Sequence, residues 1–151
     1  MNTIAQIRRV VFIIMVLVFI VLALSIQRTL HIGFPALSAL GVIFGLFGLV
    51  LIVLSATQTD SRITKAIFII NGASAVGIPI SVVLHNITYR LCIRWFGHDF
   101  WSQGGDEPIF FILAIIIFPV MFVITALAGA AVLLKTGKQQ ETKKPQQLAG
   151  G

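Results

Sequence analysis

Four long apolar segments, separated by short polar stretches, dominate the pattern of this sequence. They cover approximately residues 10–26, 36–57, 66–87 and 109–134. Each is close to or above the roughly 17–25 residues with which an α-helix crosses a bilayer. The pattern therefore predicts an all-α membrane protein, with a four-span transmembrane helical bundle within residues 1–134.

The third segment carries a polar stripe. Asn71, Ser74, Ser81 and His85 are separated by three, seven and four residues, and such steps keep them on one face of a helix. Amide, hydroxyl and imidazole groups form hydrogen bonds between helices in a membrane. We expect the stripe to be a packing seam or a contact for a polar ligand.

The second segment carries a groove of small residues at similar spacing, and small residues let two backbones approach closely. The groove consists of Ser38, Gly41, Gly45, Gly48 and Ser55. Gly41 and Gly45 form a GxxxG match. The loop at residues 58–65 is short, so the second and third spans are expected to form a tight central antiparallel hairpin. In that hairpin the groove would face the polar stripe, with Gly45 opposite Ile78.

Two prolines interrupt apolar segments. Pro79 lies within the third span and Pro119 within the fourth. Proline lacks the backbone N–H group that an inner helical turn uses. Each is therefore expected to kink its helix.

The few charged residues lie around the apolar segments. They make up 11% of the chain, against about 25% in a soluble domain, and the mean hydropathy is +1.02. If all four segments span, eight basic residues fall on one side and three on the other. The asymmetry predicts that both termini are cytoplasmic, and we expect a location in the plasma membrane. The net charge of +6 is therefore explained by topology and anionic lipid, and we expect no nucleic-acid partner.

The two ends of the chain allow different interpretations. The first apolar segment has a basic start and an Ala23-Leu24-Ser25 sequence, which also fits a signal peptide. Its apolar stretch is long for a signal, so we expect a retained helix. Residues 135–151 are rich in Lys, Gln, Thr, Pro and Gly. This composition predicts a disordered, basic cytoplasmic tail.

The outer connection, about residues 88–108, is the most varied polar part of the chain. The third helix is expected to continue past the membrane and to stop at Gly97. Aromatic and basic side chains suit the membrane interface. The expected contacts with lipid or with a partner are Arg90, Arg94, Trp95, His98 and Trp101.

No pattern in the sequence indicates a reaction. No Asp, Glu, Lys or Arg lies deep within a predicted span, whereas ion-coupled transporters generally carry such a residue. The single cysteine, Cys92, excludes an internal disulfide. The histidines His31, His85 and His98 match no metal-binding spacing. We expect no catalytic residue, no metal site and no cofactor.

Three functions remain, in order of preference. The first is a non-enzymatic membrane protein that acts by helix packing, as an accessory or structural subunit or as a homo-oligomer. Its partners would be the bilayer and another membrane protein or a second copy. The second is a binding or transport protein for a small neutral or lipid-like molecule that uses the polar stripe. The third is an enzyme with a metal or haem site at the outer face.

Overall fold

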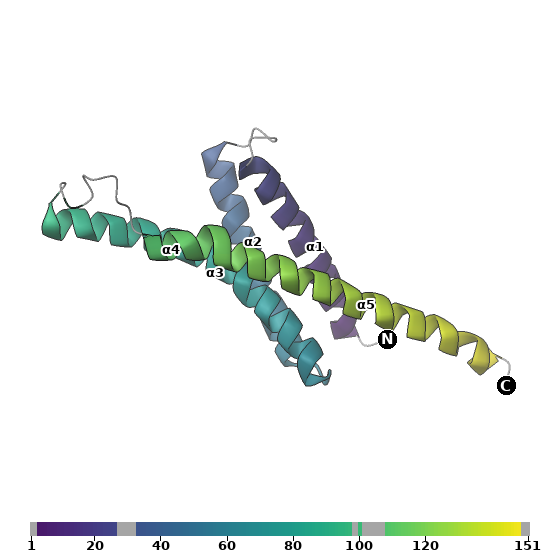
Figure 1. Ribbon diagram of the computed structural model, residues 1–151. Helices are drawn as coiled ribbons and strands as arrows, with labels where there is room; N and C mark the ends of the chain where they lie inside the picture. Colours follow the sequence, from purple (N-terminus) through teal and green to yellow (C-terminus); the bar gives the residue numbers. More distant parts are fainter. Residues whose placement is uncertain (1–2, 27–32, 98–99, 101–107, 149–151) are drawn as a thin grey trace.

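The computed structural model describes residues 3–26, 33–97, 100 and 108–148, and the side chains of Phe34 and of residues 136–148 lie outside this description. Nearly all the described residues are helical, apart from the turn at residues 57–61 and the ends at Gly33 and Gly97, and no strand occurs among them (Figure 1). The elements are α1 (Thr3–Ile26), α2 (Phe34–Ala56), α3 (Arg62–Phe96), α4 (Pro108–Ile112), the π-helix η2 (Leu113–Ile117) and α5 (Phe118–Leu148). Because α4, η2 and α5 follow one another without a break, they form one long helical segment.

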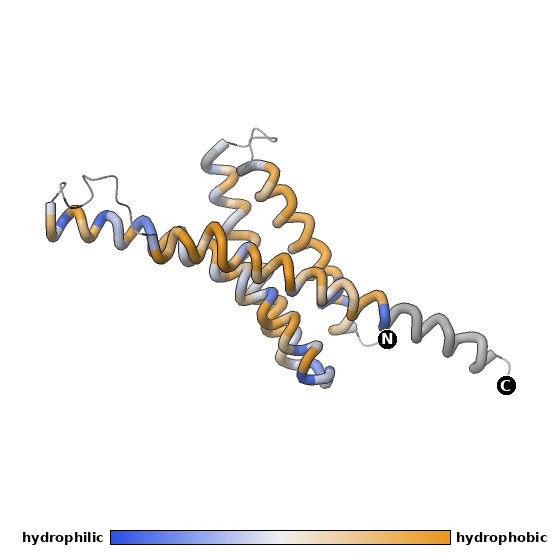
Figure 2. The backbone as a smooth tube through the Cα atoms, viewed as in Figure 1, coloured by the Kyte–Doolittle hydropathy of each residue, from blue (hydrophilic) through white to orange (hydrophobic). Residues whose placement is uncertain are grey.

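Within the described part of the chain, four helices are long and apolar enough to cross a membrane, as the sequence predicts, and Figure 2 shows their apolar lengths. They are Thr3–Ser25, Pro35–Ala56, Arg62–Phe96 and Pro108–Lys135. The all-helical, four-span prediction is confirmed at this level. One boundary differs clearly from the predicted one, because α1 begins seven residues earlier than residue 10. The α3 helix continues nine residues past residue 87, in agreement with the stop expected at Gly97.

Local sequence explains where α3 begins and ends. The hydroxyl of Ser61 accepts a hydrogen bond from the backbone N–H of Thr64 at 3.3 Å, which caps the first turn. Gly97 ends the helix with φ 86° and ψ 169°, a conformation that side chains other than glycine strongly disfavour. Its N–H group donates to the carbonyl of Ile93 at 3.0 Å. The helix stop predicted at Gly97 is therefore confirmed.

The third helix lies at the centre of the packing. It contacts α2 on one side and α4, η2 and α5 on another, while α1 packs against α2. Figure 1 shows α3 changing direction near its middle, which is where Pro79 lies. The bend agrees with the kink that the proline predicts.

Phenylalanine rings from all four long helices form the centre of the core. The ring of Phe12 meets that of Phe68 at 5.4 Å, edge to face. Phe122 lies 4.5 Å from Phe19 and 5.2 Å from Phe44, measured between ring centroids. Such arrangements are favoured by the aromatic quadrupole. These rings join α1, α2, α3 and α5.

The π-helix ends at Ile117, two residues before Pro119. The N–H group of Phe118 donates to the carbonyl of Leu113, which is the five-residue step of a π-turn. The ring of Phe118 lies against α3 at Gly77, where an added Cβ would come within 2.6 Å of it. The glycine thus makes room for the aromatic ring at the start of α5.

The α5 helix continues to Leu148, although the composition predicts disorder after Leu134. Glu, Gln and Lys are good helix formers, so the helix can be extended locally. An isolated helix in water is marginal without a packed face. The disorder of this tail in solution therefore stays a prediction.

Candidate functional site

The polar centre of the molecule is Asn71, which is completely buried between α3 and α5. Its Nδ2 donates to the carbonyl oxygen of Phe122 at 3.1 Å and to Oγ1 of Thr125 at 3.0 Å. The Thr125 hydroxyl in turn donates to the carbonyl of Met121 at 2.7 Å. Both donors of the Asn71 amide therefore have acceptors on α5, and they tie the third span to the fourth.

Two buried side-chain oxygen atoms of the core have no hydrogen-bond partner among the described residues. They are Oδ1 of Asn71 and Oγ of Ser55, and both side chains are fully buried. An unpaired buried polar atom costs about 1–3 kcal/mol. The site is thus polar but incompletely satisfied.

The other stripe residues are also turned into the protein. Ser74 is buried and donates to the carbonyl of Ile70 in its own helix at 2.9 Å. Ser81 is buried, and the half-buried His85 lies with its ring 5.8 Å from that of Phe111 in α4. The stripe therefore follows the α4–η2–α5 segment.

The expectation that the stripe faces the α2 groove is wrong. The groove meets a different set of α3 residues, namely Gly72, Ala75, Val76 and Pro79. Gly72 follows Asn71 by one residue, which is a rotation of about 100° around the helix. The small residues of α3 pack closely against α2. The polar residues of α3 lie on another face, where α5 offers hydrogen-bond acceptors.

Gly48 and Gly72 mark the closest approach of α2 and α3. A Cβ added at Gly48 would come within 2.7 Å of the Gly72 carbonyl oxygen, and one added at Gly72 within 2.6 Å of the Gly48 carbonyl oxygen. Gly45 lies against the ring of Pro79, one residue along from the Ile78 that the predicted register places there. The close contact is thus made by backbone against backbone.

The remaining groove residues differ in their surroundings. Ser55 is buried, whereas Ser38 is exposed. A Cβ added at Gly41 would meet no atom within 4 Å. The first residue of the GxxxG match therefore stands in open space, and Gly45 and Gly48 make the contact with α3.

An ion pair that the sequence reasoning missed joins Arg8 of α1 to Asp60 in the α2–α3 turn. Only 6% of Arg8 is exposed, and its guanidinium carbon lies 4.6 Å above the centre of the Phe68 ring. From the sequence alone, Arg8 is one of the eight basic residues expected to flank the spans on the cytoplasmic side. Its position four and seven residues before the buried Phe12 and Met15 is the signal that could have placed it on the inner face of α1.

The outer connection is described in part. Arg90, Arg94 and Trp95 are exposed on the last turns of α3. The rings of Phe96 and Phe100 stack across Gly97 with their centroids 4.9 Å apart. His31, His98 and Trp101 lie outside the described residues. No group of three His, Cys, Asp or Glu side chains within the described part of the chain is placed to hold a metal ion.

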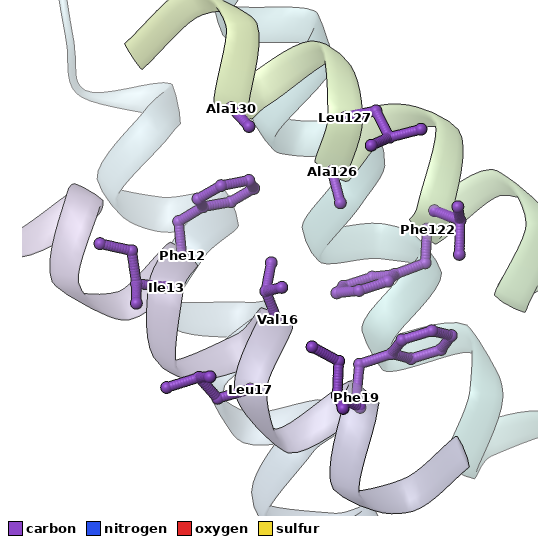
Figure 3. Close-up of a pocket in the computed structure, with 11 residues that line it drawn as sticks. Phe12, Ile13, Val16, Leu17, Phe19, Phe122, Ala126, Leu127 and Ala130 are labelled. Carbon is purple, nitrogen blue, oxygen red and sulfur yellow. The ribbon is translucent and has the colours of Figure 1, made fainter. Parts of the chain in front are cut away.

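An apolar groove separates α1 from α5 (Figure 3). It has a volume of about 420 Å³ and contains no residue of the polar stripe. The site therefore has two unlike parts, a filled polar seam between α3 and α5 and an open apolar groove beside it.

Comparison with protein-family models, with curated proteins and with solved structures finds no match to this chain.

Proposed function

We propose that this chain is a small, non-enzymatic integral membrane protein that acts by helix packing, as an accessory or structural subunit of a membrane complex or as a homo-oligomer. The observation that carries the proposal is the complete burial of Asn71, with both amide donors engaged on α5. The polar groups that a transported solute would need are used to hold helices together.

The burial of the neighbouring residues supports the same proposal. Ser74 and Ser81 are each 3% exposed. A solute that moved along α3 would have to displace the helices that cover them. Packed cores resist such displacement because they are as dense as organic crystals. The stripe is therefore better suited to fixing a structure than to conducting a substrate.

The outer end of α3 is the surface that we assign to partner contact. A helix of 35 residues is about 52 Å long, whereas the hydrocarbon core of a bilayer is about 30 Å thick. The last turns carry Trp95, which is 71% exposed, together with the exposed Arg90 and Arg94. Tryptophan and arginine are enriched at the centres of protein interfaces.

The proposed orientation places both termini and the α2–α3 turn on the cytoplasmic side of the plasma membrane. It rests on the distribution of basic residues around the spans. The Arg8–Asp60 pair then lies at the cytoplasmic end of the molecule. The outer end of α3 faces the opposite side.

The test is the association state of the tagged full-length chain in its native membrane. Chemical crosslinking before extraction in mild detergent should recover a homo-oligomer or a complex of fixed stoichiometry. Trp95→Ala should lower that recovery several-fold. Ile63→Ala is the matched control, because Ile63 is also an exposed apolar residue, 74% accessible, at the opposite end of α3. A monomer in the membrane, or equal effects of the two variants, would overturn the proposal.

The second candidate is a binding or transport protein for a small neutral or lipid-like molecule. It is favoured by Oδ1 of Asn71 and Oγ of Ser55, which have no partner among the described residues and to which such a molecule could bind. Mass spectrometry of small molecules extracted from the purified protein distinguishes the two candidates. The second candidate requires a bound compound that disappears in Asn71→Leu while the stability of that variant stays unchanged.

A further inference from the structure

The groove between α1 and α5 is lined entirely by apolar side chains. The lining residues are Phe12, Ile13, Val16, Leu17, Phe19, Ile20, Phe122, Val123, Ala126, Leu127 and Ala130. Figure 3 shows Val16 and Ala126 between the two helices, with phenylalanine rings at either end. The helices are joined beneath the groove, since Phe19 stacks on Phe122 and Phe12 lies against Gly129. A volume of about 420 Å³ falls within the usual range of ligand pockets.

A cation stands at one end of this groove. Arg9 precedes Ile13 by four residues, Val16 by seven and Ile20 by eleven, so it lies on the same face of α1 as the groove lining. Arg9 is half-buried, and no acidic side chain within the described residues pairs with it. Its neighbour Arg8 lies about 100° further round the helix and is paired with Asp60.

The length of the groove matches one leaflet of a bilayer. From Arg9 to Ile20, α1 rises about 16 Å. Half of a hydrocarbon core that is about 30 Å thick is about 15 Å. If the charged group of a lipid bound Arg9, its apolar chain would therefore lie along the groove and extend through the depth of a single leaflet.

We propose that this groove binds one acyl chain of an anionic phospholipid, and that Arg9 holds the phosphate of its headgroup. The groove offers hydrocarbon contacts alone, and a planar guanidinium group binds phosphate oxygens with two parallel hydrogen bonds. Phosphatidylcholine carries the same phosphate, but its quaternary ammonium cancels the charge, so the net attraction to Arg9 is larger for an anionic headgroup. Among the described side chains, Asp60 is paired with Arg8 and does not compete for Arg9. A second copy of the chain in the groove is the occupant against which the test below discriminates. This proposal does not depend on the proposed function.

The test uses the full-length protein in phosphatidylcholine vesicles that contain a trace of photoreactive lipid. One set receives phosphatidylglycerol with a photoreactive acyl chain, and the other receives phosphatidylcholine with the same chain. After irradiation, mass spectrometry measures the labelling of α1 and α5 peptides. We expect about fivefold more labelling by the anionic lipid, which is the preference that one interfacial arginine provides.

Two pairs of variants separate the headgroup contact from the groove. Arg9→Gln should bring the two lipids to equal labelling, whereas Arg62→Gln removes an exposed charge elsewhere and should keep the excess. Ala130→Leu should fill part of the groove and lower labelling by both lipids. Ala131→Leu, at an exposed residue outside the lining, should not.

The proposal would be overturned by equal labelling of the unchanged protein by the two lipids, or by an excess that survives Arg9→Gln. Equal labelling of α2 and of the groove would also overturn it. A disulfide crosslink between one copy that carries Leu17→Cys and another copy that carries Leu127→Cys would overturn it as well, because a second copy would then occupy the groove.

Discussion

The close packing of α2 against α3 depends on Gly48 and Gly72, because neither residue has a Cβ atom. Each glycine faces a backbone carbonyl oxygen of the other, and a Cβ on either one would approach that oxygen to less than 3.0 Å. Neither backbone can move aside as the end of a flexible side chain would. The distance between α2 and α3 is thus set by these two residues.

We expect Gly48→Ala to destabilise the protein by about 1–3 kcal/mol, which is the usual cost of overpacking. Gly41→Ala is the matched control because open space surrounds that position. Both changes carry the same gain in helix propensity of about 1 kcal/mol, so their difference isolates the contact. Thermal unfolding in detergent measures it. Equal melting temperatures would mean that α2 and α3 do not meet at Gly48.

Asn71 allows a second comparison at this scale. Asn71→Leu should destabilise by about 0.6 kcal/mol, and by at most roughly 1.7, as measured for hydrogen bonds between membrane helices. Asn86→Leu is the control, because the exposed Asn86 donates to the Val82 carbonyl of its own helix, at 2.8 Å, and to no other helix among the described residues. In a double-mutant cycle, Asn71→Leu and Thr125→Val should be non-additive. Strict additivity would show that the Asn71–Thr125 bond does not contribute.

At the scale of elements, α1 is attached differently from the other spans. It packs on α2, and its N-terminal half is held to the α2–α3 turn by Arg8 and Asp60. The Phe68 ring beneath the guanidinium adds a cation–π contact. Arg8, whose charge looks in the sequence like one that flanks a span, therefore connects α1 to the α2–α3 turn and to α3.

We expect Asp60→Asn to destabilise the protein by about 1.5–3 kcal/mol, because it leaves the guanidinium of Arg8 buried without a counter-charge. Asp60 itself is 29% exposed at its side chain, so the loss should be smaller in high salt. Arg8→Gln combined with Asp60→Asn should be less harmful than the sum of the two single changes. Chemical unfolding at two salt concentrations measures both effects. Additive single changes would argue against the pair.

The sequence predicts elements better than it predicts their faces. Segment length and hydropathy are local properties, so the four spans and the stop at Gly97 follow from composition and from one glycine. Which face of α3 meets α2 depends on a difference of about 100° between Asn71 and Gly72. That choice is decided by the acceptors at Phe122 and Thr125, more than fifty residues away. The ion pair of Arg8 is likewise not predictable from local sequence, because its partner, Asp60, lies in a turn that is distant in the chain.

For the whole molecule, the proposed orientation in the membrane rests on the distribution of charge. The N-terminus and the α2–α3 turn lie at the same end of the structure, since Arg8 contacts Asp60. The outer end of α3 lies at the other. The orientation proposed from the basic residues therefore fixes three segments together: the N-terminus and the α2–α3 turn on one side of the membrane, and the last turns of α3 on the other.

Reporter fusions test that orientation. A reporter fused to the C-terminus and one inserted in residues 97–107 should lie on opposite sides of the membrane, with the C-terminal one in the cytoplasm. The physical reason is the excess of lysine and arginine around the turn at residues 58–65 and at both termini. Two reporters on the same side would contradict the four-span topology, and exchanged sides would contradict its orientation.

The Arg8–Asp60 ion pair and the Asn71–Thr125 hydrogen bond each join residues far apart in the sequence, and this separation matters while the ribosome synthesises the chain. Asp60 follows Arg8 by 52 residues, and Thr125 follows Asn71 by 54. At about 5–20 residues per second, each earlier residue waits roughly 3–10 s for its partner. During the second interval the Asn71 amide is in the bilayer before its acceptors on the fourth span have been made. Nascent chains that stop at Gly97 should therefore be cleared faster than full-length chains in a pulse-chase experiment, and the Asn71→Leu form should lose part of that difference.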